Sequence, residues 1–412
     1  MPWAVVIPQQ WRSPLLNRNL GAGTLSPSGI NLLFGDQRKQ RILSLLRQRG
    51  PMTRAEISRA TGIAKSSISV LVDQLAVEHS VQIIRATSNN RSKSVKGRPG
   101  ELVEIDPSSG AAIGIEFGVN RMIGVIGDLS HEILSEFEVS LLPNYSVEVA
   151  LKTAEDIVNH LLSVTRITPS RIIGIGLGIA AVLYQPEEVT ADESESQNVL
   201  NRNFAENLSR ITGFSTTLEN SANLAAYAEL LWGNGFGLRD FLYFKSDNLI
   251  GGAVVMSHEV ITGSRGGVGE FGHLILDPNG PVCRCGQRGC LDTYSSIQAM
   301  TSSASVTFGH DIDLPHFRSL IEKGDSVALR ILHDGAEKLG EAAAVLSRVL
   351  NPEQIIFSGE LIALHPDVLQ LITKKFESHT LLLNSHVKLV AGSLGDQATA
   401  LGGVALILGQ GR

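Results

Sequence analysis

The sequence predicts an α/β protein in which a small helical front precedes a body made of two similar lobes. Two observations support this prediction. Three β-rich runs followed by alternating helix and strand patterns begin at residue 111, and the same order begins again at residue 241. Before them, residues 37–105 contain three short helix patterns and two short β-like runs. A repeat of this length indicates an internal duplication with a cleft between the two lobes.

Length and composition fit two or three domains, since the chain has 412 residues and 43% of them are hydrophobic. No run of 18 apolar residues occurs, so we expect no membrane span. The first residues lack the basic start of a secretory signal, and three closely grouped cysteines suit a reducing compartment. We therefore expect a cytoplasmic protein. Residues 1–36 show no sustained period and predict a flexible tail.

We call residues 37–105 the front. Its sequence pattern predicts a helix-turn-helix. A first helix pattern ends at Gly50, and Thr53 then opens a second helix with Glu56 in the position of a capping box. Gly62 follows in a turn. The third helix has apolar residues at helical spacing along one face, namely Ile68, Leu71, Val72 and Leu75. Two helices joined by a glycine-containing turn are typical of DNA-binding helix-turn-helix units.

Small polar and basic residues occupy the exposed start of the third helix, where we expect contacts to base edges and nearby phosphates. They are Lys65, Ser66, Ser67 and Ser69. Ala64 stands where a capping serine is more usual, which weakens this interpretation.

Residues 81–84 and 101–105 are β-like, and the segment between them is basic, as in the wing of a winged helix. We expect it to contact the DNA backbone through Arg91, Lys93, Lys96 and Arg98. A solvated basic loop is the alternative. Residues 37–105 contain 13 lysines and arginines against 5 acidic residues, whereas residues 106–412 contain 20 against 35. This asymmetry indicates that only the front meets a polyanion.

All three cysteines of the chain lie within eight positions, at Cys283, Cys285 and Cys290, and His273 lies ten residues before the first. Three cysteines and one histidine are a standard ligand set for structural zinc. Gly286 and Gly289 allow a short loop to fold around an ion. A chance grouping of buried cysteines is the alternative. Because four protein ligands complete a tetrahedral site, we expect this zinc to be structural and not catalytic.

Gly-Glu-Phe-Gly-His, nine intervening residues and Cys-x-Cys-Gly-x-x-Gly-Cys-Leu-Asp together resemble the signature of the ROK family of repressors and sugar kinases. The resemblance extends from about residue 37 to the C-terminus, and residues 97–99 (Gly-Arg-Pro) match the family's wing-to-body motif. It implies an N-terminal winged helix-turn-helix followed by two ribonuclease H-like lobes, as in actin and hexokinase. We also expect the C-terminal helix to pack back on the first lobe.

The resemblance also identifies parts of a ROK kinase that this chain lacks. Residues 116–120 (Glu-Phe-Gly-Val-Asn) replace the phosphate loop Asp-x-Gly-Gly-Thr, and Asp247 lies in the second phosphate loop. Ser221 occupies the position of the catalytic aspartate, and a serine hydroxyl is not a base at neutral pH. We therefore expect no catalytic residue and no kinase activity.

The sugar-facing positions match the family pattern more closely than the kinase positions do. The resemblance places them at Asn220, Glu270, His273 and Asp292, where Asp292 replaces the more usual glutamate. Carboxylates and amides suit a polyhydroxylated ligand. The alternative is that Glu270 and Asp292 only support the zinc loop.

These patterns predict a regulator, expected to be a repressor, that binds operator DNA and responds to a sugar or sugar phosphate. Its targets would be genes of carbohydrate uptake or catabolism. We expect a homodimer or a dimer of dimers. The expected domains are a tail at 1–36, a DNA-binding domain at 37–105, a first lobe at 106–232 plus 396–412, and a second lobe at 233–395. A ROK sugar kinase with a fused DNA-binding domain is the alternative, and regulation by a partner protein also stays open.

Overall fold

The computed structural model describes residues 37–77, 80–85, 101–118, 120–130, 132–142, 145–180, 202–264, 266–381 and 386–409. The expected tail at residues 1–36 therefore lies outside the described part. Within these ranges, no helix has both the length and the apolar composition needed to cross a bilayer.

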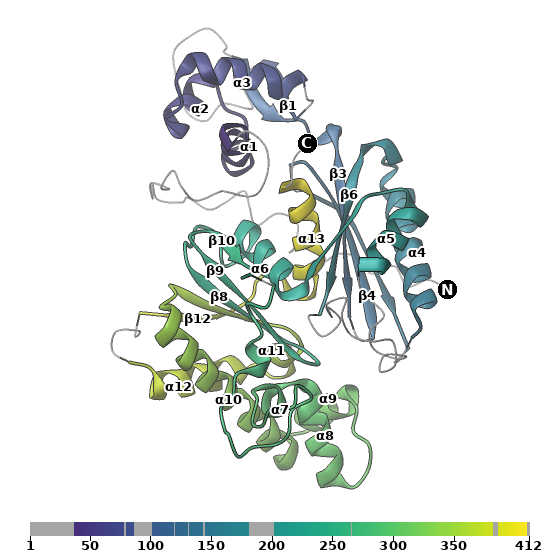
Figure 1. The fold of residues 1–412 in the computed structure, drawn as a ribbon, viewed down its shortest axis with the longest axis vertical. Helices are drawn as coiled ribbons and strands as arrows, with labels where there is room; N and C mark the ends of the chain where they lie inside the picture. The colour runs from purple at the N-terminus through teal and green to yellow at the C-terminus, as the bar shows by residue number, and fades with distance from the viewer. Residues whose placement is uncertain are drawn as a thin grey trace.

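The front lies at one end of the long axis of the molecule (Figure 1). It consists of α1 (Gln37–Arg49), α2 (Arg54–Thr61), α3 (Lys65–Val77) and the antiparallel strands β1 (Val81–Arg85) and β2 (Glu101–Ile105). Thr53 and Glu56 form the capping box that the sequence predicts. The four apolar residues of α3 are buried in a core shared with α1, α2 and both strands. Met52 joins the start of α2 to β2 through paired backbone hydrogen bonds with Val103.

The first large sheet has the strand order β5-β4-β3-β6-β7. Its strands are β3 (Ala111–Phe117), β4 (Arg121–Asp128), β5 (Ile133–Ser140), β6 (Ile172–Ile179) and β7 (Thr216–Asn220). Strands β3, β4 and β5 are antiparallel neighbours, whereas β6 and β7 run parallel to β3. Helices α4 (Val147–Thr165) and α5 (Arg202–Thr212) cover one face. We call this sheet with its helices the first lobe.

The second large sheet repeats this arrangement in the order β10-β9-β8-β11-β12. Its strands are β8 (Phe241–Ser246), β9 (Ile250–Met256), β10 (Glu259–Ile261), β11 (Gln354–Ser358) and β12 (Lys388–Ala391). The parallel and antiparallel neighbours also match those of the first sheet. Helices α10 (Ser326–Leu350) and α12 (Val368–His379) pack against it. We call this unit the second lobe, and its topology confirms the predicted duplication.

Two equivalent helices, α6 (Ser221–Trp232) and α13 (Ala398–Gly409), pack together between the lobes (Figure 1). Helix α13 follows the last strand of the second sheet but packs on β3 and β6 of the first, as expected for the C-terminal helix. Glycine allows this close approach, because a Cβ atom on Gly114 would lie 1.7 Å from the carbonyl oxygen of Ala400. Helix α6 in turn contacts β9 of the second sheet.

The region after the cysteine cluster contains a break between two helices. It forms α7 (Asp292–Ser295) and α8 (Ile297–Phe308), with Ser296 in an extended conformation between them. The Ser296 side chain accepts a hydrogen bond from the backbone N–H of Ala299 and so caps α8. Helices α9 (Leu314–Glu322) and α11 (Glu360–Leu364) complete the described helices of the second lobe.

Candidate metal centre and binding site

The cysteine cluster forms a compact knuckle whose two arms are tied by backbone hydrogen bonds. His273 ends the 3-10 turn η7 (Phe271–His273). The N–H of Leu291 donates to the carbonyl of Leu274 at 2.9 Å, and the N–H of Leu276 donates to the carbonyl of Gly289 at 2.9 Å. These bonds bring the arm that follows His273 alongside the arm that carries Cys290.

Glycine is required at the tightest point of this knuckle. Gly289 has φ 65°, and a Cβ atom there would lie 1.6 Å from the carbonyl oxygen of Asp277. Gly286 also has a positive φ, of 84°. Both glycines therefore serve the turn that the sequence predicts.

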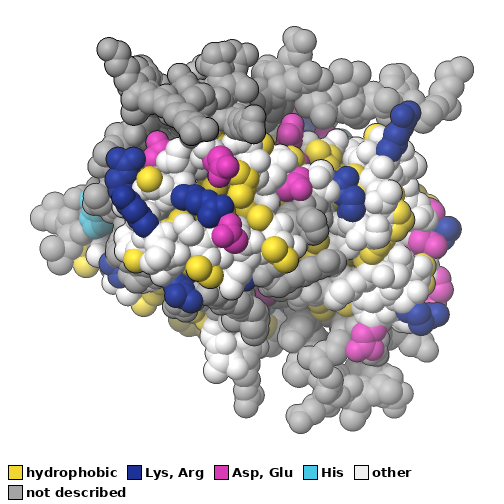
Figure 2. All heavy atoms as spheres, turned by 90° about the horizontal axis from the view of Figure 1, so that it is seen from above, with side chains coloured by type: hydrophobic (Ala, Val, Ile, Leu, Met, Phe, Trp, Pro, Cys, Tyr) yellow, Lys and Arg dark blue, Asp and Glu magenta, His cyan; other side chains and the backbone are white. Residues whose placement is uncertain are grey.

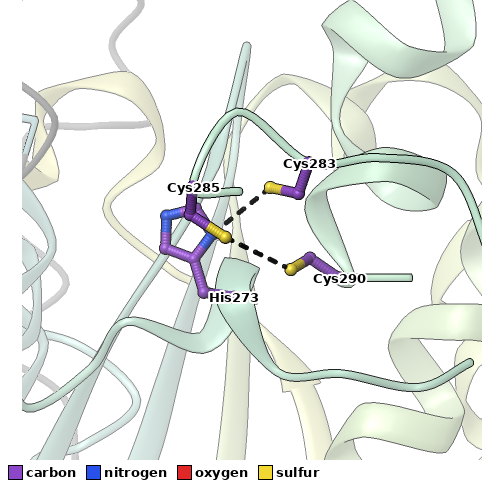
Figure 3. A group of neighbouring side chains, drawn as sticks. All are labelled: His273, Cys283, Cys285 and Cys290. Carbon is purple, nitrogen blue, oxygen red and sulfur yellow. Dashed lines mark hydrogen bonds between the residues drawn. The ribbon is translucent and has the colours of Figure 1, made fainter. Parts of the chain in front are cut away.

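The four expected ligands converge in this knuckle, and their donor atoms all lie within 4.8 Å of one another (Figure 3). Nδ1 of His273 lies 3.6 Å from Sγ of Cys283, and the Sγ atoms of Cys285 and Cys290 are 3.6 Å apart. In a tetrahedral site with Zn–S of about 2.3 Å and Zn–N of about 2.0–2.1 Å, the S–S and S–N edges measure about 3.8 and 3.6 Å. A disulfide needs about 2.05 Å between its sulfurs. The spacing therefore fits zinc and not a disulfide.

The thiols of the knuckle differ in their surroundings. The N–H of Gln287, as a hydrogen-bond donor, lowers the pKa of Cys285. Burial, followed by the neighbouring thiols of Cys285 and Cys283, raises the pKa of Cys290 to about 12. Its surroundings thus oppose the thiolate form of Cys290, which a divalent cation would stabilise.

Two of the expected sugar-facing residues lie at the edges of secondary structure. Glu270 immediately precedes η7 and is exposed. Asn220 caps α6, since its side-chain oxygen accepts hydrogen bonds from the N–H groups of Ala222 and Asn223. His273 directs its Nδ1 toward the cysteines (Figure 3). Sugar contact by these residues stays a prediction.

Asp292 has contacts that favour the supporting role left open by the sequence. It is 5% exposed, and its Oδ1 accepts a hydrogen bond of 2.7 Å from the N–H of Ile250. Its Oδ2 lies 3.3 Å from Nη2 of Arg284. Asp292 therefore ties the knuckle to the start of β9, and its sugar contact also stays a prediction.

The residues that replace the kinase loops have partners that the sequence did not suggest. Glu116, at the end of β3, and Asp247, after β8, both form ion pairs with Lys245. Ser221 is the buried first residue of α6, and its carbonyl accepts a hydrogen bond from the Thr399 hydroxyl. Lys245 lacked a sequence signal because it lies outside the motifs described above.

The residues expected at DNA divide into two groups. Lys65 and Ser66 are exposed, Ser67 and Ser69 are half-buried, and the Ser69 hydroxyl donates to the carbonyl of Lys65 at 3.2 Å. The wing residues lie outside the described part of the chain: Arg91, Lys93, Lys96 and Arg98. Figure 2 looks onto the end that carries the front, and lysine and arginine side chains lie there among acidic and hydrophobic ones.

The duplicated α/β lobes define an actin- and hexokinase-like class of protein, and the second lobe adds the histidine–cysteine knuckle to this fold. The family model named ROK family matches residues 112–410, and the chain belongs to this family.

Relatives of this chain include both regulators and kinases. The xylose repressor of Bacillus spizizenii is 28% identical over 374 residues, covering 89% of this chain and 94% of the repressor. A solved ROK family transcriptional regulator, a homologue of E. coli Mlc, has a TM-score of 0.72 at 21% identity and covers 90% of this chain and 96% of its own. The ROK hexokinase of Thermus thermophilus has a TM-score of 0.60 at 27% identity, covering 72% of this chain and 97% of its own.

Proposed function

We propose that this chain is a DNA-binding transcriptional repressor whose affinity for its operator responds to a sugar or sugar derivative. One observation carries the proposal. The match to the xylose repressor covers 89% of the chain, whereas residues 112–410 alone make up less than three quarters of it. The similarity therefore extends beyond the lobes into the front.

The front, residues 37–105, acts in this proposal as a winged helix-turn-helix. Its three helices and β1–β2 hairpin share one core, so the unit has the elements that such a domain needs. The exposed start of α3, with Lys65 and Ser66, enters the major groove. The wing contacts the DNA backbone through Arg91, Lys93, Lys96 and Arg98. A homodimer presents two such units to a two-fold symmetric operator.

The sugar binds beside the zinc knuckle, in the cleft between the lobes. The first lobe comprises residues 106–232 plus 396–412, and the second comprises residues 233–395. Glu270 is the best supported ligand, because its exposed carboxylate directly precedes the turn that presents His273. Asn220 offers its side-chain NH₂ while its oxygen caps α6. The zinc is structural and fixes Glu270 relative to Asp292. The protein acts in the cytoplasm on genes of carbohydrate uptake or catabolism.

Phosphoryl transfer is not part of this proposal. Ser221 supplies no general base, and such a base contributes about 10²–10⁴-fold to a rate. Asp247, held by Lys245, adds negative charge where the family's second phosphate loop would meet a nucleotide.

A two-stage experiment tests the proposal on the full-length chain. Sugars and sugar phosphates are first screened by thermal shift, where a ligand at 100 times its Kd stabilises by about 2.7 kcal/mol. Random duplex DNA is then selected by binding to the chain, with and without the sugar that shifts the melting temperature. We expect one enriched, two-fold symmetric sequence. Enrichment of no sequence would contradict a DNA-binding function, and a screen in which no sugar acts would favour a protein partner.

A further inference from the structure

The central strands of the two sheets end opposite each other with complementary charges. Strand β3 is the middle strand of the first sheet and β8 is the middle strand of the second. Glu116 is the penultimate residue of β3, and Lys245 is the penultimate residue of β8. The duplication thus places a carboxylate and an ammonium group at equivalent positions of the two lobes.

These two groups meet in a largely buried ion cluster. Nζ of Lys245 lies 2.6 Å from Oε1 of Glu116 and 2.6 Å from Oδ2 of Asp247. The side chains of Lys245 and Glu116 are 15% and 9% exposed. Burial alone would lower the pKa of Lys245, but the carboxylates of Asp247 and Glu116 outweigh it and raise this pKa above its ordinary value. Lys245 therefore remains charged between its two partners.

A second set of ion pairs lies beside this cluster, and its pair between Arg121 and Glu360 crosses between the lobes. Arg121 of β4 lies 3.7 Å from Glu360 of α11 and 2.9 Å from Asp396, which precedes α13. The N–H of Glu360 also donates to Oδ1 of Asp247 at 2.8 Å. This hydrogen bond links Glu360 of the second set to Asp247 of the first, so the two sets form one connected network.

The network also reaches the knuckle through the β8–β9 turn. The N–H of Ile250 donates to Asp292, which follows the last cysteine of the knuckle. The carbonyl of Asp247 accepts a hydrogen bond of 3.1 Å from the N–H of Ile297 at the start of α8. A displacement of Asp292 would therefore move the turn that carries Asp247.

We propose that Lys245 is a positioning residue that latches the two lobes together by joining Glu116 of the first lobe to Asp247 of the second. This charge pairing joins residues that replace the two phosphate loops of the family's kinases. Given the sugar response proposed above, the latch also sets how readily the sugar changes the angle between the lobes. Breaking a buried pair leaves an uncompensated charge, so loss of one partner acts on both lobes at once.

The test compares hydrogen–deuterium exchange in the full-length chain and its variants, without sugar or DNA. Lys245→Met removes the charge and keeps most of the side-chain volume. The matched control is Lys375→Met, because Lys375 also lies between two carboxylates, Glu337 and Glu341, but all three belong to the second lobe. We expect Lys245→Met to speed exchange at least tenfold at the ends of both β3 and β8. Lys375→Met should change exchange only in α10 and α12.

A charge swap separates pairing from packing. The double variant Glu116→Lys with Lys245→Glu restores a lysine–glutamate pair across the lobes, and we expect exchange in both strands to return toward that of the wild type. Faster exchange confined to β8 in Lys245→Met, or no recovery in the swap, would overturn the latch. If Lys245→Met does not fold, Glu116→Gln gives the same comparison from the first lobe. Because no sugar or DNA is present, these outcomes do not depend on the proposed repressor function.

Discussion

The histidine–cysteine knuckle predicts that zinc stabilises this chain in proportion to the logarithm of its free concentration. Two donor spacings of 3.6 Å already match the edges of a zinc tetrahedron, and all four donor atoms lie within 4.8 Å of one another, so binding requires shifts of about 1 Å or less. Raising free zinc from well below its Kd to 100 times its Kd should stabilise the folded state by about 2.7 kcal/mol. At roughly 2–4 °C per kcal/mol, this corresponds to a rise of about 5–10 °C in the melting temperature.

The assay is thermal unfolding in zinc buffers, with elemental analysis of the same samples. Cys290→Ser removes a fully buried ligand and should abolish most of the rise, because a serine hydroxyl binds zinc poorly. Arg288→Ala is the matched control, since Arg288 is an exposed, non-ligand residue of the same knuckle, and it should keep the response. A wild-type melting temperature that does not depend on free zinc, in protein without bound metal, would refute the zinc site.

Three further predictions follow from the site and the front. In a coupled assay with ATP and common hexoses, the chain should show no turnover approaching ~1 s⁻¹, the low end of the kinase range. A rate at that level would show that Ser221 does not prevent catalysis. Glu270→Gln should weaken sugar binding, measured by calorimetry, by about 1.5–3 kcal/mol with zinc content unchanged, whereas the exposed control Glu322→Gln should not weaken it. Equal sugar affinities of Glu270→Gln and the wild type would show that Glu270 does not bind the sugar. Lys65→Ala should reduce the slope of log K against log salt for DNA binding by ~0.9, and an unchanged slope would exclude a phosphate contact there.

The fold could be predicted largely because its elements have strong local patterns. Buried apolar runs separated by turns indicated the strands of both sheets, and Thr53 with Glu56 indicated the start of α2. The break between α7 and α8 could not be predicted, because no glycine or proline marks it. It depends on distant partners, since the Ser295 hydroxyl donates to the carbonyl of Gly335 and the N–H of Ile297 donates to Asp247.

The candidate site shows the same contrast between local and distant contacts. The four ligands of the knuckle lie within one short loop, so their spacing in the sequence already indicated a common site. The pairing of Glu116 with Lys245 joins residues 129 positions apart and depends on how the two lobes face each other. The sequence therefore showed Glu116 and Asp247 only as replacements in the kinase loops. Their shared partner became visible only in the folded chain.

Coupling between sugar and DNA binding is the central claim, and fluorescence anisotropy of a labelled operator duplex measures it directly. The full-length chain is titrated onto the selected duplex at fixed salt, with and without a saturating concentration of the sugar found by thermal shift. We expect the sugar to change the Kd for operator about 5–150-fold while leaving the affinity for a scrambled duplex nearly unchanged. An operator Kd that is the same with and without a sugar that demonstrably binds would contradict the account.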